Sequence, residues 1–223
     1  MYLYDCNGKR IKYDTTDKLG EGLIYSDVYK ISDEVCLKVF KTNSGDINFD
    51  VLSLIKDLEL SHFYIIYDFL FNKTGKFKGY TMKYYPGKTI DILTMPTSYT
   101  LDNFSSIYNS ILKLTDNGIV VSDLHSGNVI TDENNITVID ADLYYKLCFI
   151  DKIKLQYKNI SALIYLFKDL YFESLDEFHK DCDVNACVSA IRDLFEPMDA
   201  LNIDKVYKKF TRYKYPIDYI KSR

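Results

Sequence analysis

The chain has 223 residues, and 47% of them are hydrophobic, including 21 Tyr and 13 Phe, which excludes a disordered polypeptide and allows one large domain or two small lobes. The net charge of −4 comes from interspersed acidic and basic residues and argues against a broad nucleic-acid-binding surface. Five cysteines without a C-x-x-C pair predict free thiols rather than a disulfide framework or a zinc site. No apolar run approaches the roughly 18 residues of a membrane span, so we expect a cytoplasmic protein. Delivery into another cell by a specialised secretion system would leave no mark in the sequence.

The first 85 residues are predicted to form a small sheet with one inserted helix. Short runs rich in Tyr, Phe, Val and Ile alternate with turn signals, and a polar link containing Gly75 joins the last two runs as a hairpin. Apolar residues at helical spacing predict a helix from Phe49 to Leu60. The expected strands are residues 23–31, 34–40, 64–71 and 80–85.

The composition changes after Pro86 and Gly87, and the rest of the chain is predicted to be mainly helical. Apolar residues recur at helical spacing over residues 102–117, and Gly118 gives a C-terminal signal. Further helices are expected over residues 159–171, 184–196 and 202–210. The sequence therefore predicts an α+β protein with a β-rich lobe at residues 1–85 and a helical lobe at residues 86–223.

Two features of the first lobe are suited to binding an anion. Gly20 and Gly22 flank Glu21 in a turn, where backbone N–H groups without a neighbouring Cβ can approach phosphate oxygens, although such turns are also common in ordinary hairpins. Lys38 lies inside the apolar strand of residues 35–40, where an ammonium group is costly unless it meets an anion. An edge-strand lysine with its head in solvent is the alternative.

The most informative segment places Asp123 and Asn128 in a polar loop between two runs of β-branched apolar residues. The next expected strand, residues 136–139, ends at Asp140, where a metal-binding carboxylate would face the same loop. Two unrelated surface aspartates would explain either piece alone. They do not explain the order and spacing of both pieces.

In this order the glycine turn, the strand lysine, the polar loop and the second aspartate resemble the motifs of the protein-kinase superfamily, over about residues 17–170. The Asp-Leu-His-Ser-Gly-Asn segment at residues 123–128 is similar to the loop of aminoglycoside and choline phosphotransferases and of many atypical bacterial kinases. The resemblance implies a two-lobed kinase-like fold with a reduced C-terminal lobe. It also implies phosphoryl transfer from ATP with Mg²⁺, or alternatively Mn²⁺.

The resemblance assigns a role to each residue of the motifs. Lys38 would pair with the α- and β-phosphates, and Asp123 would orient the attacking hydroxyl and accept its proton. Asn128 and Asp140 would hold the metal ion. His125 takes the place of the catalytic-loop lysine of Ser/Thr kinases, and would either donate to the transferred phosphoryl group or pack within the loop.

Other positions would surround the nucleotide by the same resemblance. Met82 corresponds to the gatekeeper, and the backbones of Lys83 and Tyr85 would bond the adenine edge. Asp50 is the candidate acid that clamps Lys38. The remaining expected nucleotide contacts are Gly20, Glu21, Gly22, Val28 and Cys36.

Three departures from the usual kinase pattern bear on function. Ser122 stands where an arginine is usual, which predicts activity without a phosphorylated activation loop. Asn159 stands where an aspartate usually begins the central helix, and the chain beyond Asp140 leaves only a reduced peptide-docking platform. The first hypothesis is a compact atypical Ser/Thr kinase with a protein substrate. A small-molecule kinase and a nucleotide-binding pseudokinase are the alternatives.

Overall fold

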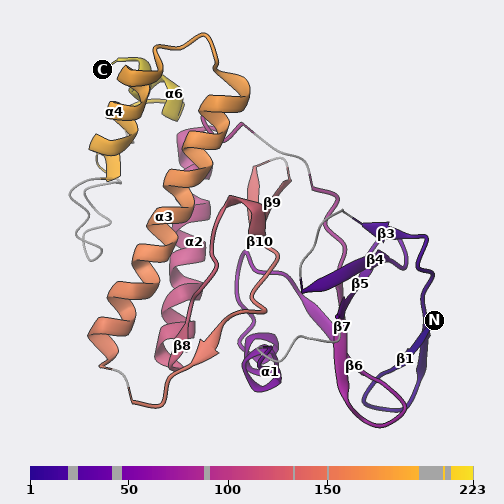
Figure 1. The fold of residues 1–223 in the computed structure, drawn as a ribbon. Helices are drawn as coiled ribbons and strands as arrows, with labels where there is room; N and C mark the ends of the chain where they lie inside the picture. The colour runs from indigo at the N-terminus through magenta and orange to yellow at the C-terminus, as the bar shows by residue number, and fades with distance from the viewer. Residues whose placement is uncertain are drawn as a thin grey trace. The chain divides into compact units, whose positions relative to one another are not determined.

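The computed structural model describes residues 1–19, 25–41, 47–87, 91–132, 134–149, 151–195, 208 and 212–222. The chain forms two compact units, shown in Figure 1. The first comprises Met1–Asp57 and Tyr64–Pro86, and the second comprises Leu58–Phe63 and Gly87–Arg223. Together they make an α+β protein in which the largest sheet lies in the first unit and the long helices lie in the second.

The first unit contains an antiparallel sheet, which in the described residues has seven strands in the order β2-β1-β6-β7-β5-β4-β3. Helix α1 (Phe49–Asp57) follows β5 in the chain and buries Val51, Leu52 and Ile55. The strands are β1 (Tyr2–Tyr4), β2 (Arg10–Lys12), β3 (Lys18–Leu19), β4 (Ser26–Lys30), β5 (Val35–Phe40), β6 (Ile66–Phe71) and β7 (Phe77–Lys83).

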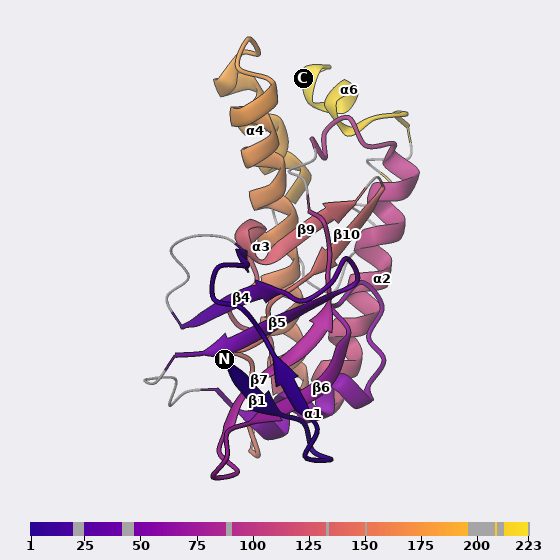
Figure 2. The same cartoon turned by 90° about the vertical axis from the view of Figure 1, so that its right-hand side faces the viewer.

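The strands β4, β5 and β7 lie next to one another in the sheet (Figure 2), and their register determines which side chains share a face. Val28 lies opposite Lys38, and Lys38 lies opposite Tyr80 on β7. Cys36, which is two residues before Lys38 on β5, lies opposite Met82. Directly opposed residues, and residues two apart along a strand, point to the same side of a sheet. These five side chains therefore line one face.

Gly79 of β7 permits an unusually close approach to β5. It pairs with Val39 and has φ +157°, and a Cβ atom at this position would lie 2.0 Å from the backbone oxygen of Lys38. A side chain there would displace the backbone that carries Lys38. Only glycine fits this position without moving the strand.

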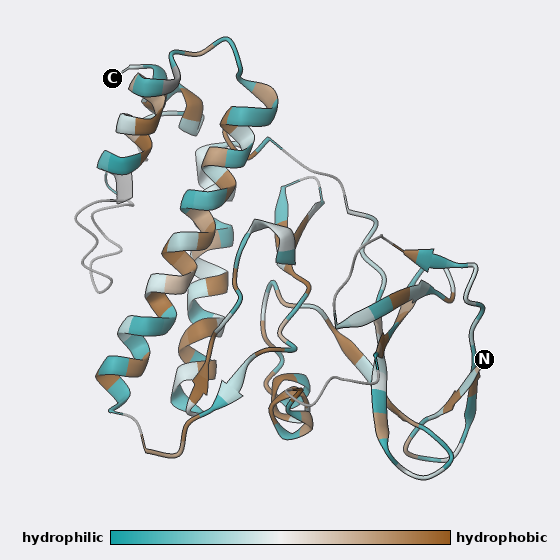
Figure 3. Ribbon diagram, viewed as in Figure 1, coloured by the Kyte–Doolittle hydropathy of each residue, from teal (hydrophilic) through white to brown (hydrophobic). Residues whose placement is uncertain are grey.

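The second unit is organised around two long helices, α2 (Thr97–Asp116) and α3 (Lys152–Phe178), which pack side by side. Apolar and polar stretches alternate along both helices (Figure 3), and the rings of Phe104 and Phe167 meet with their centroids 4.9 Å apart. Shorter elements complete the unit. They are β8 (Ile119–Val120), the 3₁₀ helix η1 (Ser126–Asn128), β9 (Val129–Asp132), β10 (Asn135–Val138), β11 (Tyr145–Lys146), α4 (Val184–Phe195) and α6 (Pro216–Lys221).

The secondary structure confirms the main sequence predictions and adds elements that the sequence did not indicate. The predicted α+β class, the helix after β5 and the hairpin at Gly75, which has φ +78°, are all present. The sequence did not predict helix α6 or the strands β1, β2, β3, β8, β9 and β11. The expected helix at residues 202–210 lies outside the described residues except for Lys208, and residues 23 and 24 of the first expected strand also lie outside them. Among the described helices, none has the length and apolar composition needed to cross a membrane.

Candidate active site

Asn159 of α3 anchors the start of the polar loop that is predicted to be catalytic. This side chain is fully buried, and its Oδ1 accepts a hydrogen bond of 2.9 Å from the Val121 amide. Its Nδ2 donates to the Ile119 carbonyl at 2.8 Å and to the Thr115 hydroxyl at 2.9 Å. An asparagine can accept and donate at once, whereas an ionised aspartate can only accept. The residue that departs from the usual kinase pattern thus ties α2, β8 and α3 together.

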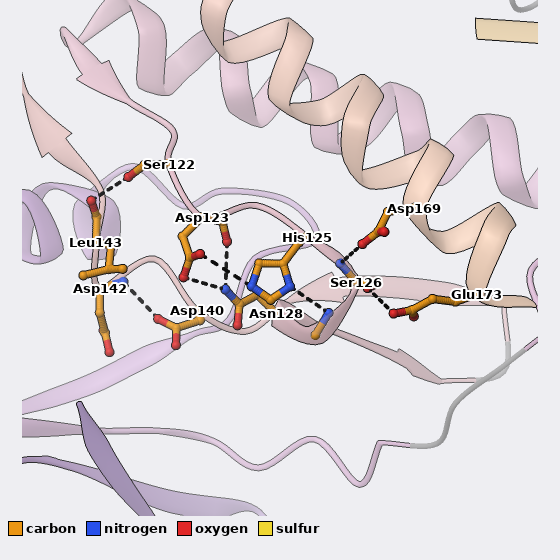
Figure 4. Close-up of polar contacts among 11 residues, drawn as sticks. Ser122, Asp123, His125, Ser126, Asn128, Asp140, Asp142, Leu143, Asp169 and Glu173 are labelled. Carbon is orange, nitrogen blue, oxygen red and sulfur yellow. Dashed lines mark hydrogen bonds and ion pairs between the residues drawn. The ribbon is translucent and has the colours of Figure 1, made fainter. Parts of the chain in front are cut away.

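Asp123 sits in the loop with an unusual backbone conformation. Its φ is +58°, in the left-handed region that side chains other than glycine rarely adopt, although aspartate and asparagine are enriched there. The Nδ2 group of Asn128 donates to the Asp123 carbonyl at 2.7 Å and to its carboxylate at 3.1 Å (Figure 4). Nearly half of the Asp123 side chain remains exposed. The loop thus presents a carboxylate to solvent in a fixed orientation.

His125 folds back into the same loop. Its Nδ1 accepts a hydrogen bond of 3.1 Å from the Gly127 amide, so in this network the ring proton resides on Nε2. Nε2 lies 3.5 Å from the Asp123 carboxylate. The imidazole therefore lies beside this carboxylate, with 43% of its own side chain exposed. Both predicted roles of His125, donation to a phosphoryl group and packing in the loop, stay predictions.

Ser126 attaches the loop to α3. Its amide donates to the Asp169 carboxylate at 3.0 Å, and its hydroxyl donates to the Glu173 carboxylate at 2.6 Å. Asp169 and Glu173 are four residues apart and therefore lie on the same side of the helix. Neither residue carries a signal in the sequence, where both are ordinary polar positions of an amphipathic helix.

Asp140 is held beside the loop by the β9–β10 hairpin. Val138 pairs with Val129, and the next amide along, that of Ile139, donates to the Asn128 carbonyl at 2.9 Å. The Asp140 carboxylate then accepts a hydrogen bond of 3.0 Å from the amide of Asp142 (Figure 4). Within the second unit, the structure thus links the backbone next to Asp140 directly to Asn128, the other predicted metal ligand.

Ser122 connects the start of the loop with the segment that follows Asp140. Its hydroxyl donates to the Leu143 carbonyl at 2.6 Å. This contact joins two neutral groups and needs no phosphate. Ser122 therefore contacts the segment beyond Asp140 directly. The arginine usual at this position in kinases would instead bind a phosphorylated residue.

Tyr144 is a buried residue of the segment that follows Asp140. Its side chain is 1% exposed, and its hydroxyl has no hydrogen-bond partner among the residues that the structure describes. Burial, together with the negative charges of Asp140 and Asp123, raises the pKa of this hydroxyl well above its usual value. Tyr144 was not identified from the sequence, where it is one of 21 tyrosines.

The predicted nucleotide residues that the structure describes lie in the first unit, mostly on one face of the sheet. Lys38 is 4% exposed and shares that face with Val28, Cys36 and Met82. The Cys36 thiol donates to the Lys83 carbonyl at 3.7 Å, and burial raises its pKa to about 11.

Other predicted nucleotide contacts have different surroundings. The Lys83 amide donates to the Ile65 carbonyl at 3.0 Å, and the bond of the Lys83 backbone to adenine stays a prediction. Tyr85 is half-buried, and burial raises the pKa of its hydroxyl. Asp50 is exposed in the first turn of α1, and its clamping of Lys38 stays a prediction. Gly20, Glu21 and Gly22 lie outside the described residues.

Comparisons with known proteins support the fold. No protein-family model matches the chain, and no curated protein matches it. Among solved structures, the chain is similar to the Cydia pomonella granulovirus kinase PK-1, with a TM-score of 0.58 and 18% sequence identity. The match covers 90% of this chain and 91% of the viral kinase. The chain therefore has a protein-kinase-like fold.

Proposed function

We propose that the protein is an ATP- and Mg²⁺-dependent phosphotransferase, and specifically a compact atypical Ser/Thr protein kinase. The observation that carries the proposal is the loop of residues 123–128, in which Asn128 and His125 hold an exposed Asp123 carboxylate. A carboxylate oriented in this way can position a hydroxyl group and accept its proton. The kinase-like fold supports the same interpretation.

The polar groups around the loop suit a hard divalent cation. Asn128 commits its amide nitrogen to Asp123, which leaves its oxygen as a ligand, and the Asp140 carboxylate supplies the negative charge. Mg²⁺ prefers oxygen ligands and often keeps several waters, so it needs few ligands from the protein. When bound, it would neutralise charge on the transferred phosphoryl group.

The first unit offers features suited to the nucleotide. Lys38 places a buried ammonium group on one face of the sheet, and the attraction between this cation and a phosphate would be strong where water is excluded. Cys36 and Met82 would contact the adenine ring from the same face. The Lys83 carbonyl accepts a weak thiol hydrogen bond among the described contacts, so it can accept a stronger one from the adenine amino group.

The class of acceptor defines the second candidate. The Asp-Leu-His-Ser-Gly-Asn sequence at residues 123–128 is the version found in small-molecule phosphotransferases, and this observation favours an aminoglycoside- or choline-type acceptor. Both candidates share the same transfer chemistry. A pseudokinase, the third alternative, is disfavoured because Lys38, Asp123, Asn128 and Asp140 are all retained.

Transfer from γ-labelled ATP to generic protein substrates and to small hydroxylated acceptors tests the proposal and separates the two candidates. Asp123→Ala is expected to keep Mg-ATP affinity and to lose about 10²-fold or more in rate, because a positioned base is removed. Lys38→Ala is expected to lower kcat and to weaken ATP binding, because the phosphates lose their cation. Asp132→Ala, an exposed aspartate at the end of β9, is the matched control. Wild-type turnover by Asp123→Ala would refute the assignment of the loop.

A further inference from the structure

The Tyr144 hydroxyl is a buried polar group that the packing of the ring does not require. Buried tyrosine hydroxyls usually find a hydrogen-bond partner, because an unsatisfied one loses its contact with water and gains nothing in return. The Tyr144 hydroxyl has none within the described part of the chain, although the side chain is 1% exposed. Phenylalanine would fill the same space without this penalty. The presence of a buried hydroxyl group without a hydrogen-bond partner among the described residues therefore needs an explanation.

Backbone contacts fix Tyr144 in the segment that follows Asp140 and that pairs with the entrance to the Asp123 loop. Its amide donates to the Ala141 carbonyl at 3.1 Å, which closes the turn that follows Asp140. The next residue, Tyr145, pairs with Val120 at the entrance to the loop that carries Asp123. These two contacts fix the backbone at Tyr144 and at its neighbour. Burial and then the negative charges of Asp140 and Asp123, the two carboxylates of the proposed site, raise the pKa of the Tyr144 hydroxyl.

We infer that Tyr144 is a positioning residue of the cation site, and that its hydroxyl donates a hydrogen bond to an oxygen, such as a cation-bound water, that enters when the site is filled. The inference rests on the proposed function, because it requires a divalent cation at Asn128 and Asp140. Among the described residues no acceptor uses this donor. Filling the site then removes the penalty of an unsatisfied hydroxyl and favours the bound form.

Metal binding by two phenylalanine variants tests this role. Tyr144→Phe removes only the hydroxyl, and Tyr171→Phe makes the same change at another buried tyrosine, where burial alone raises the pKa. Mn²⁺ binding is followed by electron paramagnetic resonance in protein loaded with a non-hydrolysable ATP analogue. We expect Tyr144→Phe to bind Mn²⁺ about three- to tenfold more weakly, the effect of one hydrogen bond. Tyr171→Phe should bind as the wild type does.

The melting temperature without added metal or nucleotide gives a second readout that does not depend on activity. We expect Tyr144→Phe to melt at or above the wild-type temperature, because it loses an unsatisfied group. A clearly lower melting temperature would mean that the hydroxyl is already bonded, for instance to a permanent water, and would overturn the inference. Equal Mn²⁺ affinity in wild type and Tyr144→Phe would overturn it while leaving the proposed function intact. A wild-type protein that bound no Mn²⁺ would refute the proposed function and this inference with it.

Discussion

Replacing Asn159 by aspartate, the residue usual at this position in kinases, should destabilise this protein. The introduced carboxylate would keep the acceptor for the Val121 amide but would lose the donor to the Ile119 carbonyl and the Thr115 hydroxyl. Two buried hydrogen bonds would be broken and a charge would be placed in a fully buried site, at a cost of about 2–4 kcal/mol in the free energy of unfolding. For a chain of this size that corresponds to a melting temperature lower by roughly 4–16 °C.

Thermal unfolding followed by circular dichroism measures this loss, with Asn117→Asp as the matched control. Asn117 also donates its side-chain amide to a backbone carbonyl, that of Lys113 at 2.9 Å, but the contact is exposed and its loss should cost a few tenths of a kcal/mol. Burial should raise the pKa of the carboxyl introduced at position 159. Its penalty should therefore be smaller near pH 4 than at pH 7, because the folded state tolerates the protonated form better. Equal stability of Asn159→Asp and the wild type at pH 7 would refute the assignment of the three hydrogen bonds.

Three further predictions concern the metal ion, regulation and the sheet. Mg-ATP should raise the melting temperature, and Asp140→Asn should abolish most of the part that depends on the metal; an equal shift without Mg²⁺ would argue against the metal site. Transfer activity should survive phosphatase treatment, because the Ser122 hydroxyl contacts the Leu143 carbonyl directly; complete loss of activity would contradict this reasoning. At pH 8 only about one Cys36 thiol in a thousand should be ionised, given its pKa of about 11. Alkylating reagents should therefore modify the exposed Cys148 long before Cys36, as peptide mass spectrometry can follow.

The elements that could be predicted from sequence are those with a strong local pattern. Strand β5 is an apolar run interrupted by a single lysine, and the end of α2 is marked by Gly118, which adopts φ +74° as a helix C-terminal signal requires. Strands β1 and β2 have only three residues each. They form because Leu3 pairs with Ile11 and Tyr4 pairs with Phe71, and the second of these partners lies far along the chain. No local signal could have shown that pairing.

Helix α3 shows a signal that was present in the sequence but not used. The helix was expected from residue 159, yet it begins at Lys152 because the Asp151 carboxylate accepts hydrogen bonds from the amides of Ile153 and Lys154 at 2.9 and 3.1 Å. An aspartate before a helix is a recognised N-cap. It was missed because most of the first turns are exposed, with Leu155 buried among polar neighbours, so the hydrophobic period is weak there.

The residues of the candidate site also fall into those that the sequence predicts and those that only the fold brings together. Residues 123–128 were predicted because the side chains that act together are adjacent in the chain. Asp169 and Glu173 contact the loop only in the folded protein, and only there do the charges of Asp140 and Asp123 influence the pKa of Tyr144. The residue types of all three are common on helices and in cores. The function of Asn159 was predicted least well. In the sequence it is a departure from a pattern, and in the structure it is a satisfied anchor.

The positive φ of Asp123 explains why this loop needs so many anchors. A left-handed conformation costs roughly 1–2 kcal/mol at a residue with a side chain, so the loop would relax if its neighbours did not hold it. The Ser126 amide donates to the Asp169 carboxylate, and a hydrogen bond to a charged acceptor contributes about 1.5–3 kcal/mol where it is shielded from water. Asn159 holds the loop entrance and the Ser122 hydroxyl holds the facing segment. These contacts join groups that the chain already carries, so the second unit orients the Asp123 carboxylate in the unmodified protein.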